Sequence, residues 1–294
     1  MKLISYISSL IIGASLILVF EPFNFWFLTF FIPLSLYFLI KDHDIKSSFY
    51  LGWFFGFGLW LIGIFWIENS IYFYGGAAKS VSYFLVICLS AFLALLNGIF
   101  FGIFAYCKTK TNFDILFLFP SIWVGSEWLR EFLLSGFPWF YLGYTSLDNF
   151  FFSGFIPIFG VFGMSFILIF IPALIFVLGE SLISGRQKKI SLIYLTIFSL
   201  FLIASFSSYK VEWTTKKDEV NIVIIQPNIS IEEKWSFQGE NESINLFKSK
   251  IKEHSSKSKD KDILSIIFWP EVFLPGLSSK YTDSLLYTSD AADE

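Results

Sequence analysis

Residues that build metal sites, disulfides and nucleic-acid surfaces are scarce in this sequence. It has two cysteines and two histidines in 294 residues, so it encodes no disulfide framework and no metal centre with several sulfur or imidazole ligands. Charged residues make up only 15%, the net charge is −3, and no basic patch is interleaved with aromatic residues. A nucleic-acid partner is therefore not expected. No metal or other cofactor is predicted either.

Hydrophobic residues, in contrast, dominate the chain. They make up 55% of the sequence, and aromatic residues alone reach 21%, with 40 phenylalanines. Soluble globular domains carry roughly 25% charged residues, so this composition is typical of a membrane protein. The long apolar runs lie within residues 1–208, whereas residues 209–283 are rich in Lys, Glu, Asp, Ser and Asn. We predict a transmembrane helical domain over 1–208 and a water-facing domain over 209–283.

Several apolar runs in the first domain have the length of membrane spans. A hydrocarbon core of about 30 Å takes roughly 20 helical residues, and the alternation typical of barrel strands is not visible. Seven runs reach this length or nearly do: 3–20, 23–40, 49–67, 81–107, 113–130, 154–179 and 190–208. The second run follows the first without a small-residue cleavage site. The first run is therefore expected to be a retained anchor rather than a signal peptide.

Lysine and arginine in the connections predict how these spans are oriented. With a cytoplasmic N-terminus, the inside connections hold eight Lys or Arg residues, and the outside ones hold only Lys79 and Arg130. The inside residues are Lys2, Lys41, Lys46, Lys108, Lys110, Arg186, Lys188 and Lys189. Lys210, Lys216 and Lys217 argue weakly for the reverse, but the charges of a long exported domain have little influence. We therefore predict that residues 209 onward are extracytoplasmic.

The histidines and cysteines do not come together in this topology. His43 and His254 fall on opposite sides of the membrane, which excludes a Ser-His-Asp set or a metal site built from them. Cys88 and Cys107 lie within, or at the end of, the fourth span. We expect these two cysteines to be small packing residues.

The water-facing domain opens with a strand–helix–strand pattern. Residues 220–229, "VNIVIIQPNI", are mostly β-branched or apolar and stop at a Pro-Asn turn signal. In residues 240–254, Ile244, Phe247 and Ile251 recur at helical spacing, and a second apolar run follows. This pattern predicts a parallel βαβ unit. The chemistry of such units gathers beyond the carboxyl ends of the strands.

A lone carboxylate follows the second predicted strand. Glu271 lies in the apolar and aromatic run "SIIFWPEVFLPG", where Pro270 and Pro275 stiffen the loop around it. A buried acid without a partner is costly, so Glu271 is expected to be either paired or used in chemistry. Its aromatic neighbours would desolvate it and raise its pKa toward neutrality, which suits a general base. The alternative is a structural carboxylate hydrogen-bonded to strand-end amides.

Blocks of sequence along the chain resemble the bacterial apolipoprotein N-acyltransferases. One is "SEWLREFLLSGFPWFYLGYTSLDN", preceded by "GIFWIENSIYFYGG" and followed by "PIFGVFGMSF"; another is "IIQPNISIEEKW" with "IIFWPE". The resemblance implies a multi-pass enzyme of the bacterial inner membrane. It implies a membrane all-α bundle of about seven transmembrane helices, followed by the start of an α/β nitrilase-like (carbon-nitrogen hydrolase) αββα sandwich domain.

The same resemblance implies a mechanism. In that family the glutamate of "WPE" is the general base of a Glu-Lys-Cys triad, a role that falls on Glu271. The cysteine takes a fatty acyl chain from a phospholipid as a thioester. It then passes the chain to the amino group of the N-terminal diacylglyceryl-cysteine of a lipoprotein. Trp235, which ends "IIQPNISIEEKW", is placed near the acyl chain, with a plain packing tryptophan as the alternative.

An aromatic-rich connection is expected on the outer side of the membrane. Residues 131–152 would suit the bilayer surface where both lipid substrates arrive. We predict substrate contacts for Phe137, Pro138, Trp139 and Tyr144. A plain interfacial belt of aromatic residues is the alternative.

A charge pair precedes that connection. Glu127 and Arg130 are three residues apart on one face of the fifth predicted span, near its outer end. This spacing predicts an ion pair that orients the helix rather than a direct part in catalysis.

The end of the chain departs from the family pattern. The triad's lysine and cysteine and a last span are expected beyond residue 294, so this polypeptide is expected to be inactive by itself. No alanine occurs between Tyr209 and Asp283, yet the chain closes on "SLLYTSDAADE". Residues 284–294 are therefore expected to be a non-native tail.

Two other functions remain open from the sequence. One is a membrane-tethered nitrilase-like amidase that hydrolyses a small extracytoplasmic amide, although so many spans exceed what a tether needs. The other is a transporter. Transporters usually show internal repeats and charged groups near the middle of the membrane, and neither is visible here.

Overall fold

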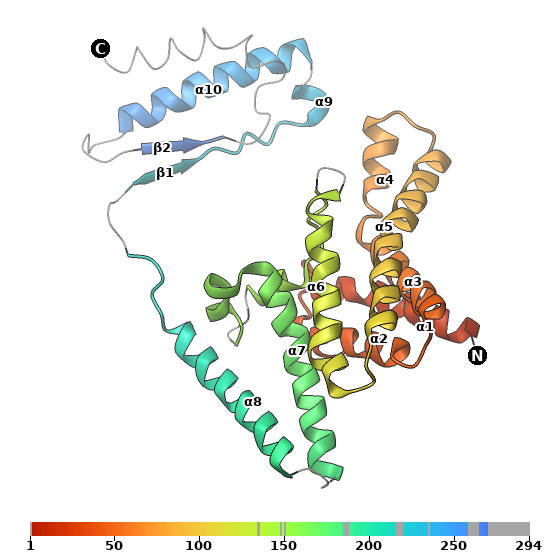
Figure 1. The fold of residues 1–294 in the computed structure, drawn as a ribbon. Helices are drawn as coiled ribbons and strands as arrows, with labels where there is room; N and C mark the ends of the chain where they lie inside the picture. The colour runs from red at the N-terminus through yellow and green to blue at the C-terminus, as the bar shows by residue number, and fades with distance from the viewer. Residues whose placement is uncertain are drawn as a thin grey trace. The chain divides into compact units, whose positions relative to one another are not determined.

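The computed structural model in Figure 1 describes residues 2–133, 136–147, 149, 151–184, 188–215, 220–234, 236–257 and 265–269. It divides into two compact units, Met1–Trp213 and Thr214–Glu294. The first unit is helical, and the second holds two strands and two helices in its described part. Each unit is described by itself below.

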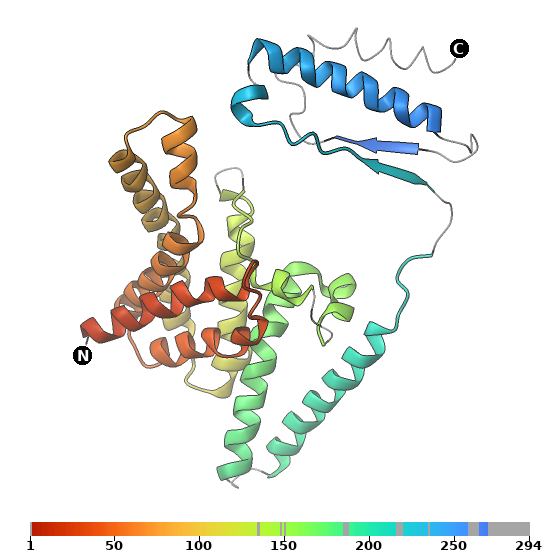
Figure 2. The same ribbon diagram turned by 180° about the vertical axis from the view of Figure 1, so that it is seen from behind.

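The first unit consists of helices joined by short 3-10 and π turns. Its α-helices are α1 (Lys2–Ser15), α2 (Ile32–Ile40), α3 (Ile45–Gly63), α4 (Ile67–Asn69), α5 (Lys79–Cys107), α6 (Phe119–Arg130), α7 (Ile156–Ser184) and α8 (Lys188–Tyr209). The turns are η1 (Leu16–Val19), η2 (Trp26–Phe30), η3 (Ser70–Tyr74), η4 (Asp114–Leu118), η6 (Leu142–Ser146) and η7 (Ser153–Phe155). Both ribbon views show α8 diverging from α7 (Figures 1 and 2).

Within the described residues, four helices are long and apolar enough to cross a membrane, which indicates a membrane protein. They are Ile45–Gly63, Lys79–Cys107, Ser153–Ser184 and Ser191–Tyr209, and they correspond to the predicted third, fourth, sixth and seventh spans. The first two apolar runs form the shorter helices Leu3–Val19 and Trp26–Ile40. The fifth run is divided between the π turn η4 and α6. The count of seven spans therefore stays a prediction.

Helices α1 and α3 cross in direct backbone contact. A Cβ atom added at Gly13 would lie 1.8 Å from the backbone oxygen of Phe55. One added at Gly58 would lie 2.1 Å from the backbone oxygen of Leu10. Apolar helices in lipid associate through such close van der Waals packing, which small residues permit. The two glycines therefore set the crossing of α1 and α3.

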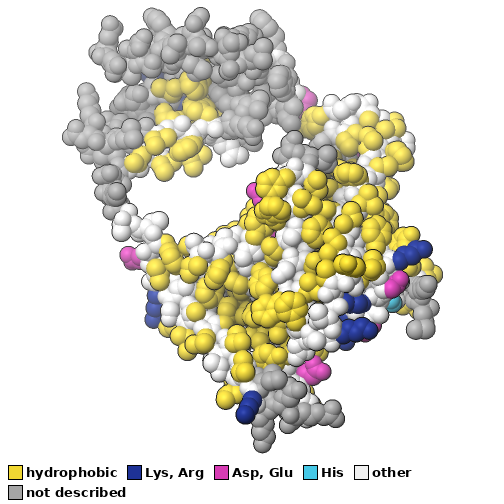
Figure 3. All heavy atoms as spheres, viewed as in Figure 1, with side chains coloured by type: hydrophobic (Ala, Val, Ile, Leu, Met, Phe, Trp, Pro, Cys, Tyr) yellow, Lys and Arg dark blue, Asp and Glu magenta, His cyan; other side chains and the backbone are white. Residues whose placement is uncertain are grey.

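Helix α3 also packs along α5, and the outer surface of the unit is largely hydrophobic. Trp60 donates from Nε1 to Asn97 Oδ1 at 3.1 Å, between the two helices. Hydrophobic side chains cover much of the face shown in Figure 3, as on a helix bundle that meets lipid. Cys88 and Cys107 lie on the exposed surface of α5. The prediction that these cysteines pack inside is wrong, because a thiol is apolar enough to face outward from a lipid-facing helix.

Two connections predicted on the same side of the membrane meet at one end of the unit. Lys108, just after α5, donates from Nζ to the backbone oxygens of Lys41 and His43, which follow α2. A cation at the carbonyl end of a helix is favourable because the unpaired carbonyls there carry partial negative charge. The loops after α2 and α5 thus lie together, as alternating spans require.

Replacing Asp114 by alanine is expected to destabilise the first unit by about 1–3 kcal/mol, the cost of leaving buried donors without an acceptor. Asp114 is 3% exposed, and its carboxylate accepts hydrogen bonds from Thr109 N (2.8 Å), Thr109 Oγ1 (2.9 Å) and Lys110 N (2.6 Å). Unfolding of the detergent-solubilised protein measures the loss. Glu131→Ala, at an exposed acid on another loop, is the matched control. Equal losses in the two variants would show that these bonds add nothing.

The second unit contains the predicted strand–helix–strand arrangement. Strands β1 (Asn221–Ile224) and β2 (Ser265–Phe268) pair in parallel. Helices α9 (Ile231–Lys234) and α10 (Phe237–Lys257) come between them in sequence, and α10 runs alongside the pair (Figure 1). The parallel βαβ unit is confirmed. A complete nitrilase-like sandwich stays a prediction.

Helix α10 turns its predicted apolar face inward. Ile244, Phe247 and Ile251 are half-buried. The ring of Phe247 lies 4.7 Å from that of Trp269, the residue that follows β2. Helix α10 therefore contacts the chain just beyond the carboxyl end of β2.

Candidate functional site

Two predicted site residues lie outside the described residues. They are Glu271, the expected general base, and Trp235, the residue expected near the acyl chain. The described chain reaches Trp269, just after β2. Because β1 and β2 are parallel, their carboxyl ends share one edge of the pair, where α/β proteins place their chemistry. In sequence, Glu271 follows that edge directly.

A buried carboxylate near the end of α6 binds the loop that follows it. Glu127 is 2% exposed. Its Oε1 accepts hydrogen bonds from Trp123 Nε1, one turn earlier in α6, and from the backbone N–H of Leu142, both at 2.9 Å. The second bond joins positions 15 residues apart. Glu127 therefore fixes the loop against the helix.

A buried guanidinium binds the same loop. Arg130 is 6% exposed and donates from Nη1 to the backbone oxygen of Trp139 at 2.7 Å. Its guanidinium carbon lies 4.9 Å from the ring centre of Trp60 and 5.0 Å from that of Tyr141. Desolvated cation–π contacts of this kind are each worth about 2 kcal/mol. The backbone oxygen of Arg130 also accepts from Phe137 N at 2.8 Å.

Glu127 and Arg130 each bond to the loop, and the ion pair predicted between them stays a prediction. Their opposite charges attract across one turn of α6, but the hydrogen bonds given above carry both groups to the loop. The sequence predicts a pair that orients the helix, and the geometry shows a helix end that holds the loop. That arrangement anchors the loop to the end of α6.

The four aromatic and proline candidates in the loop divide into two sets. Phe137 and Trp139 are half-buried, with ring centres 4.9 Å apart, and Trp139 lies 5.4 Å from Trp66. Pro138 is exposed, and Tyr144 is 45% exposed. The first set packs within the loop, whereas the second lies on its exposed surface.

Three other buried residues with polar groups are absent from the sequence prediction. Ser165 Oγ accepts from Gly143 N at 2.8 Å and attaches the loop to α7. Tyr141 is buried, and its ring stacks 5.8 Å from that of Tyr144. Glu68 is 5% exposed, and its Oε1 has no hydrogen-bond partner among the described residues. All three lie inside the sequence blocks that carry the resemblance, which is the signal that could have found them.

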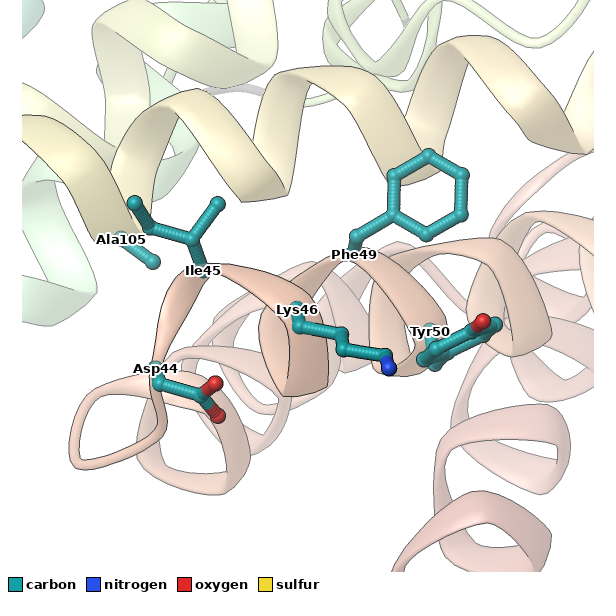
Figure 4. A pocket seen from close by; sticks show the side chains of 6 residues that line it. All are labelled: Asp44, Ile45, Lys46, Phe49, Tyr50 and Ala105. Carbon is teal, nitrogen blue, oxygen red and sulfur yellow. The ribbon is translucent and has the colours of Figure 1, made fainter.

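A hollow lies between the start of α3 and the end of α5. It has a volume of about 590 Å³ and is lined by Asp44, Ile45, Lys46, Phe49, Tyr50 and Ala105 (Figure 4). Ile45 and Phe49 lie on the side of α3 toward α5, and Lys46 and Tyr50 point away. Asp44 caps α3 by accepting from Ser47 N at 3.3 Å. Hydrogen bonding to the Ser47 side chain, and less strongly to its backbone, lowers the pKa of the Asp44 carboxyl. No group of three or more His, Cys, Asp or Glu in the described part is placed to hold a metal.

The fold, with the loop that Glu127 and Arg130 anchor, defines a helical membrane protein in which a parallel α/β unit follows α8. Comparison with known proteins makes the assignment specific. Residues 12–174 match the model of the apolipoprotein N-acyltransferase N-terminal domain. The chain belongs to the apolipoprotein N-acyltransferase family.

Individual relatives agree with the family match. The apolipoprotein N-acyltransferase of Pasteurella multocida is 30% identical over 282 residues, which are 95% of this chain and 52% of that protein. The protein of the same name from Coxiella burnetii is 34% identical over 91% of this chain and 53% of its own length. That of Haemophilus influenzae is 29% identical over 96% of this chain and 52% of its own length. The chain thus spans about half the length of these relatives.

Proposed function

We propose that this chain belongs to an enzyme that transfers a fatty acyl chain from a phospholipid to the N-terminal diacylglyceryl-cysteine of lipoproteins. The observation that carries the proposal is the family match over residues 12–174, with relatives of that name aligned to more than nine-tenths of the chain. Long apolar helices followed by a parallel strand pair support it. We place the enzyme in the bacterial inner membrane, with its N-terminus cytoplasmic and residues 209 onward extracytoplasmic.

In this proposal the carboxylate of Glu271 acts as the general base. It takes the proton of a cysteine thiol, and the thiolate attacks the ester carbonyl carbon of the phospholipid. A C–S bond forms, the C–O ester bond breaks, and the lysophospholipid leaves with the proton. The amino group of the lipoprotein then attacks the thioester carbon, which forms an amide and regenerates the thiol.

The described loop adds a surface role to this scheme. Exposed Pro138 and Tyr144 are proposed to contact the lipid substrates, with Trp235 near the acyl chain. Half-buried Phe137 and Trp139 are proposed to support the loop from beneath. A rigid loop held by buried charges suits this task, because a positioned contact loses less entropy on binding.

Glu271→Gln in the full-length enzyme is expected to lower the rate constant of acyl transfer by about 10²–10⁴-fold, the usual contribution of a general base. Glutamine keeps the size of the side chain but cannot accept the thiol proton. Transfer of a labelled acyl chain from phospholipid vesicles to a synthetic diacylglyceryl lipopeptide measures the rate. Glu242→Gln, on the exposed side of α10, makes the same chemical change and should keep full activity. A Glu271→Gln enzyme as fast as that control would refute the assignment.

The assay also separates the alternative of a membrane-tethered amidase. Such an enzyme would use Glu271 in the same way but would hydrolyse soluble amides and need no phospholipid. We propose that residues 1–294 alone do not catalyse transfer, because their cysteines, Cys88 and Cys107, both belong to α5. An acyl adduct formed on this polypeptide in the same assay would overturn that point.

A further inference from the structure

A polar cavity lies at the end of the first unit where the loops after α2 and α5 meet. It has a volume of about 220 Å³. Its charged lining consists of two lysines and three carboxylates: Lys41, Lys110, Asp42, Asp114 and Glu180. Thr111 and Asn112 add neutral polar groups. This cavity lies at the opposite end of α6 and α7 from the loop that Glu127 and Arg130 hold, so it is separate from the site described above.

Some charged groups of this cavity already have partners within the protein, and others are exposed. The carboxylate of Asp114 is occupied by the hydrogen bonds from Thr109 and Lys110 described above. Lys41 places Nζ 5.1 Å from the ring centre of Phe38. Asp42, Lys110 and Glu180 are exposed on the cavity lining. The cavity therefore offers ammonium groups and carboxylates to a ligand at the same time.

An apolar groove begins where the polar cavity ends. It has a volume of about 430 Å³ and runs between the η2–α2 segment and α7. Its lining consists of Phe30, Phe31, Leu34, Ser35, Phe38, Pro172, Ile175 and Phe176. Phe38 and Phe176 line both hollows, and their rings meet edge to face with centres 4.8 Å apart. The two hollows are therefore adjacent, with this aromatic pair at their boundary.

We propose that these hollows together hold one phospholipid with a phosphoethanolamine headgroup. The headgroup occupies the polar cavity and an acyl chain lies along the apolar groove. In the predicted orientation this lipid belongs to the cytoplasmic leaflet, because Lys41, Lys110 and Glu180 all fall in connections predicted inside. It is a bound structural lipid, distinct from the acyl donor proposed for the outer side.

The chemistry of the lining selects this headgroup. Lys41 and Lys110 match the phosphate, while Asp42 and Glu180 match the ammonium group. An anionic headgroup would meet an excess of carboxylates over lysines, so it is disfavoured. A choline headgroup carries a cation but no N–H donor for those carboxylates.

Lipid binding to the delipidated full-length protein tests the proposal. Dioleoyl phosphatidylethanolamine, phosphatidylglycerol or phosphatidylcholine is titrated into the detergent-solubilised protein, and bound lipid is counted by native mass spectrometry. Phosphatidylethanolamine is expected to bind about tenfold more tightly than phosphatidylglycerol, and Lys41→Ala/Lys110→Ala should lose about tenfold. Lys46→Ala is the matched control, since Lys46 lies at the same end of the bundle but lines the other hollow.

A second variant tests the groove rather than the headgroup. Ile175→Trp places a larger side chain in the groove from an exposed position on α7, and it should reduce the occupancy of all three lipids. Ile62→Trp, at an exposed position on α3 outside the groove, is its control. Glu271→Gln should bind lipid like the wild type, so this result is independent of the proposed activity.

Three outcomes would overturn the proposal. The first is phosphatidylglycerol or phosphatidylcholine binding as tightly as phosphatidylethanolamine. The second is a double-lysine variant indistinguishable from Lys46→Ala. The third is a lipid-free dimer that Ile175→Trp dissociates, which would make a second copy of the chain the occupant of the groove.

Discussion

Replacing Arg130 by methionine is expected to destabilise the first unit by about 3–5 kcal/mol, the usual cost of removing one member of a buried charge pair. Arg130 and Glu127 are 6% and 2% exposed. Methionine fills similar space but leaves the carboxylate of Glu127 buried without its opposite charge. It also leaves the backbone oxygen of Trp139 without its 2.7 Å donor. The loop should therefore detach before the helices unfold.

A double-mutant cycle isolates the charge term. Glu127→Gln keeps an oxygen that can accept from Trp123 and Leu142 but removes the negative charge. The double variant Glu127→Gln/Arg130→Met should lose less than the sum of the single losses, with a coupling of about 0.5–3 kcal/mol. Denaturant unfolding in detergent measures all four proteins, with Lys46→Met as an exposed-cation control. Strict additivity would mean that the two charges do not stabilise each other.

Gly58→Val is expected to separate α1 from α3, at a cost of about 3 kcal/mol or more, the upper range for overpacked interiors. An added Cβ would lie 2.1 Å from the backbone oxygen of Leu10, and a backbone atom cannot move aside as a side chain can. Gly13→Val makes the same test from α1, because a Cβ added at Gly13 would lie 1.8 Å from the backbone oxygen of Phe55. A lower yield of folded protein and a lower unfolding midpoint are the expected readouts.

The matched control for this prediction is Gly179→Val in α7. A Cβ at Gly179 would meet nothing within 4 Å, and the helix propensity of valine exceeds that of glycine. This variant should keep the wild-type stability or gain up to about 0.5 kcal/mol. If Gly58→Val and Gly179→Val behaved alike, backbone contact between α1 and α3 would not govern the stability of the unit.

The long helices and the parallel strand pair were within reach of the sequence. A membrane-crossing helix needs only an uninterrupted apolar run, which hydropathy measures directly. The βαβ unit shows itself through the change from a β-branched, apolar run to helical spacing around Phe247. The helix lengths in the first two apolar runs, 3–20 and 23–40, were harder to predict, because the length of an apolar run does not show where the helix is interrupted. Asn24 adopts a positive φ of 50° between them, and Pro33 starts α2 anew.

The contacts that Glu127 and Arg130 make with other residues could not be predicted from the sequence. The spacing of Glu127 and Arg130 shows that they share a helix face, but their other partners are backbone groups of Leu142 and Trp139. Every residue offers the same backbone N–H and C=O, so no pattern of side chains marks these partners. The cation–π contact with Trp60 is hidden for another reason, since it depends on how α3 and α6 pack. Glu271 and Trp235 stay predictions.

The way α6 holds its loop has a consequence for the evolution of the family. The hydrogen bonds from Glu127 and Arg130 end on main-chain atoms of Leu142 and Trp139, whatever side chains stand there. Substitutions at the exposed positions Pro138 and Tyr144 leave these bonds intact. Selection can therefore alter the exposed surface of the loop by single substitutions while the path of its backbone is inherited unchanged. Diversity among relatives should concentrate on that surface, and the two anchoring charges should vary least.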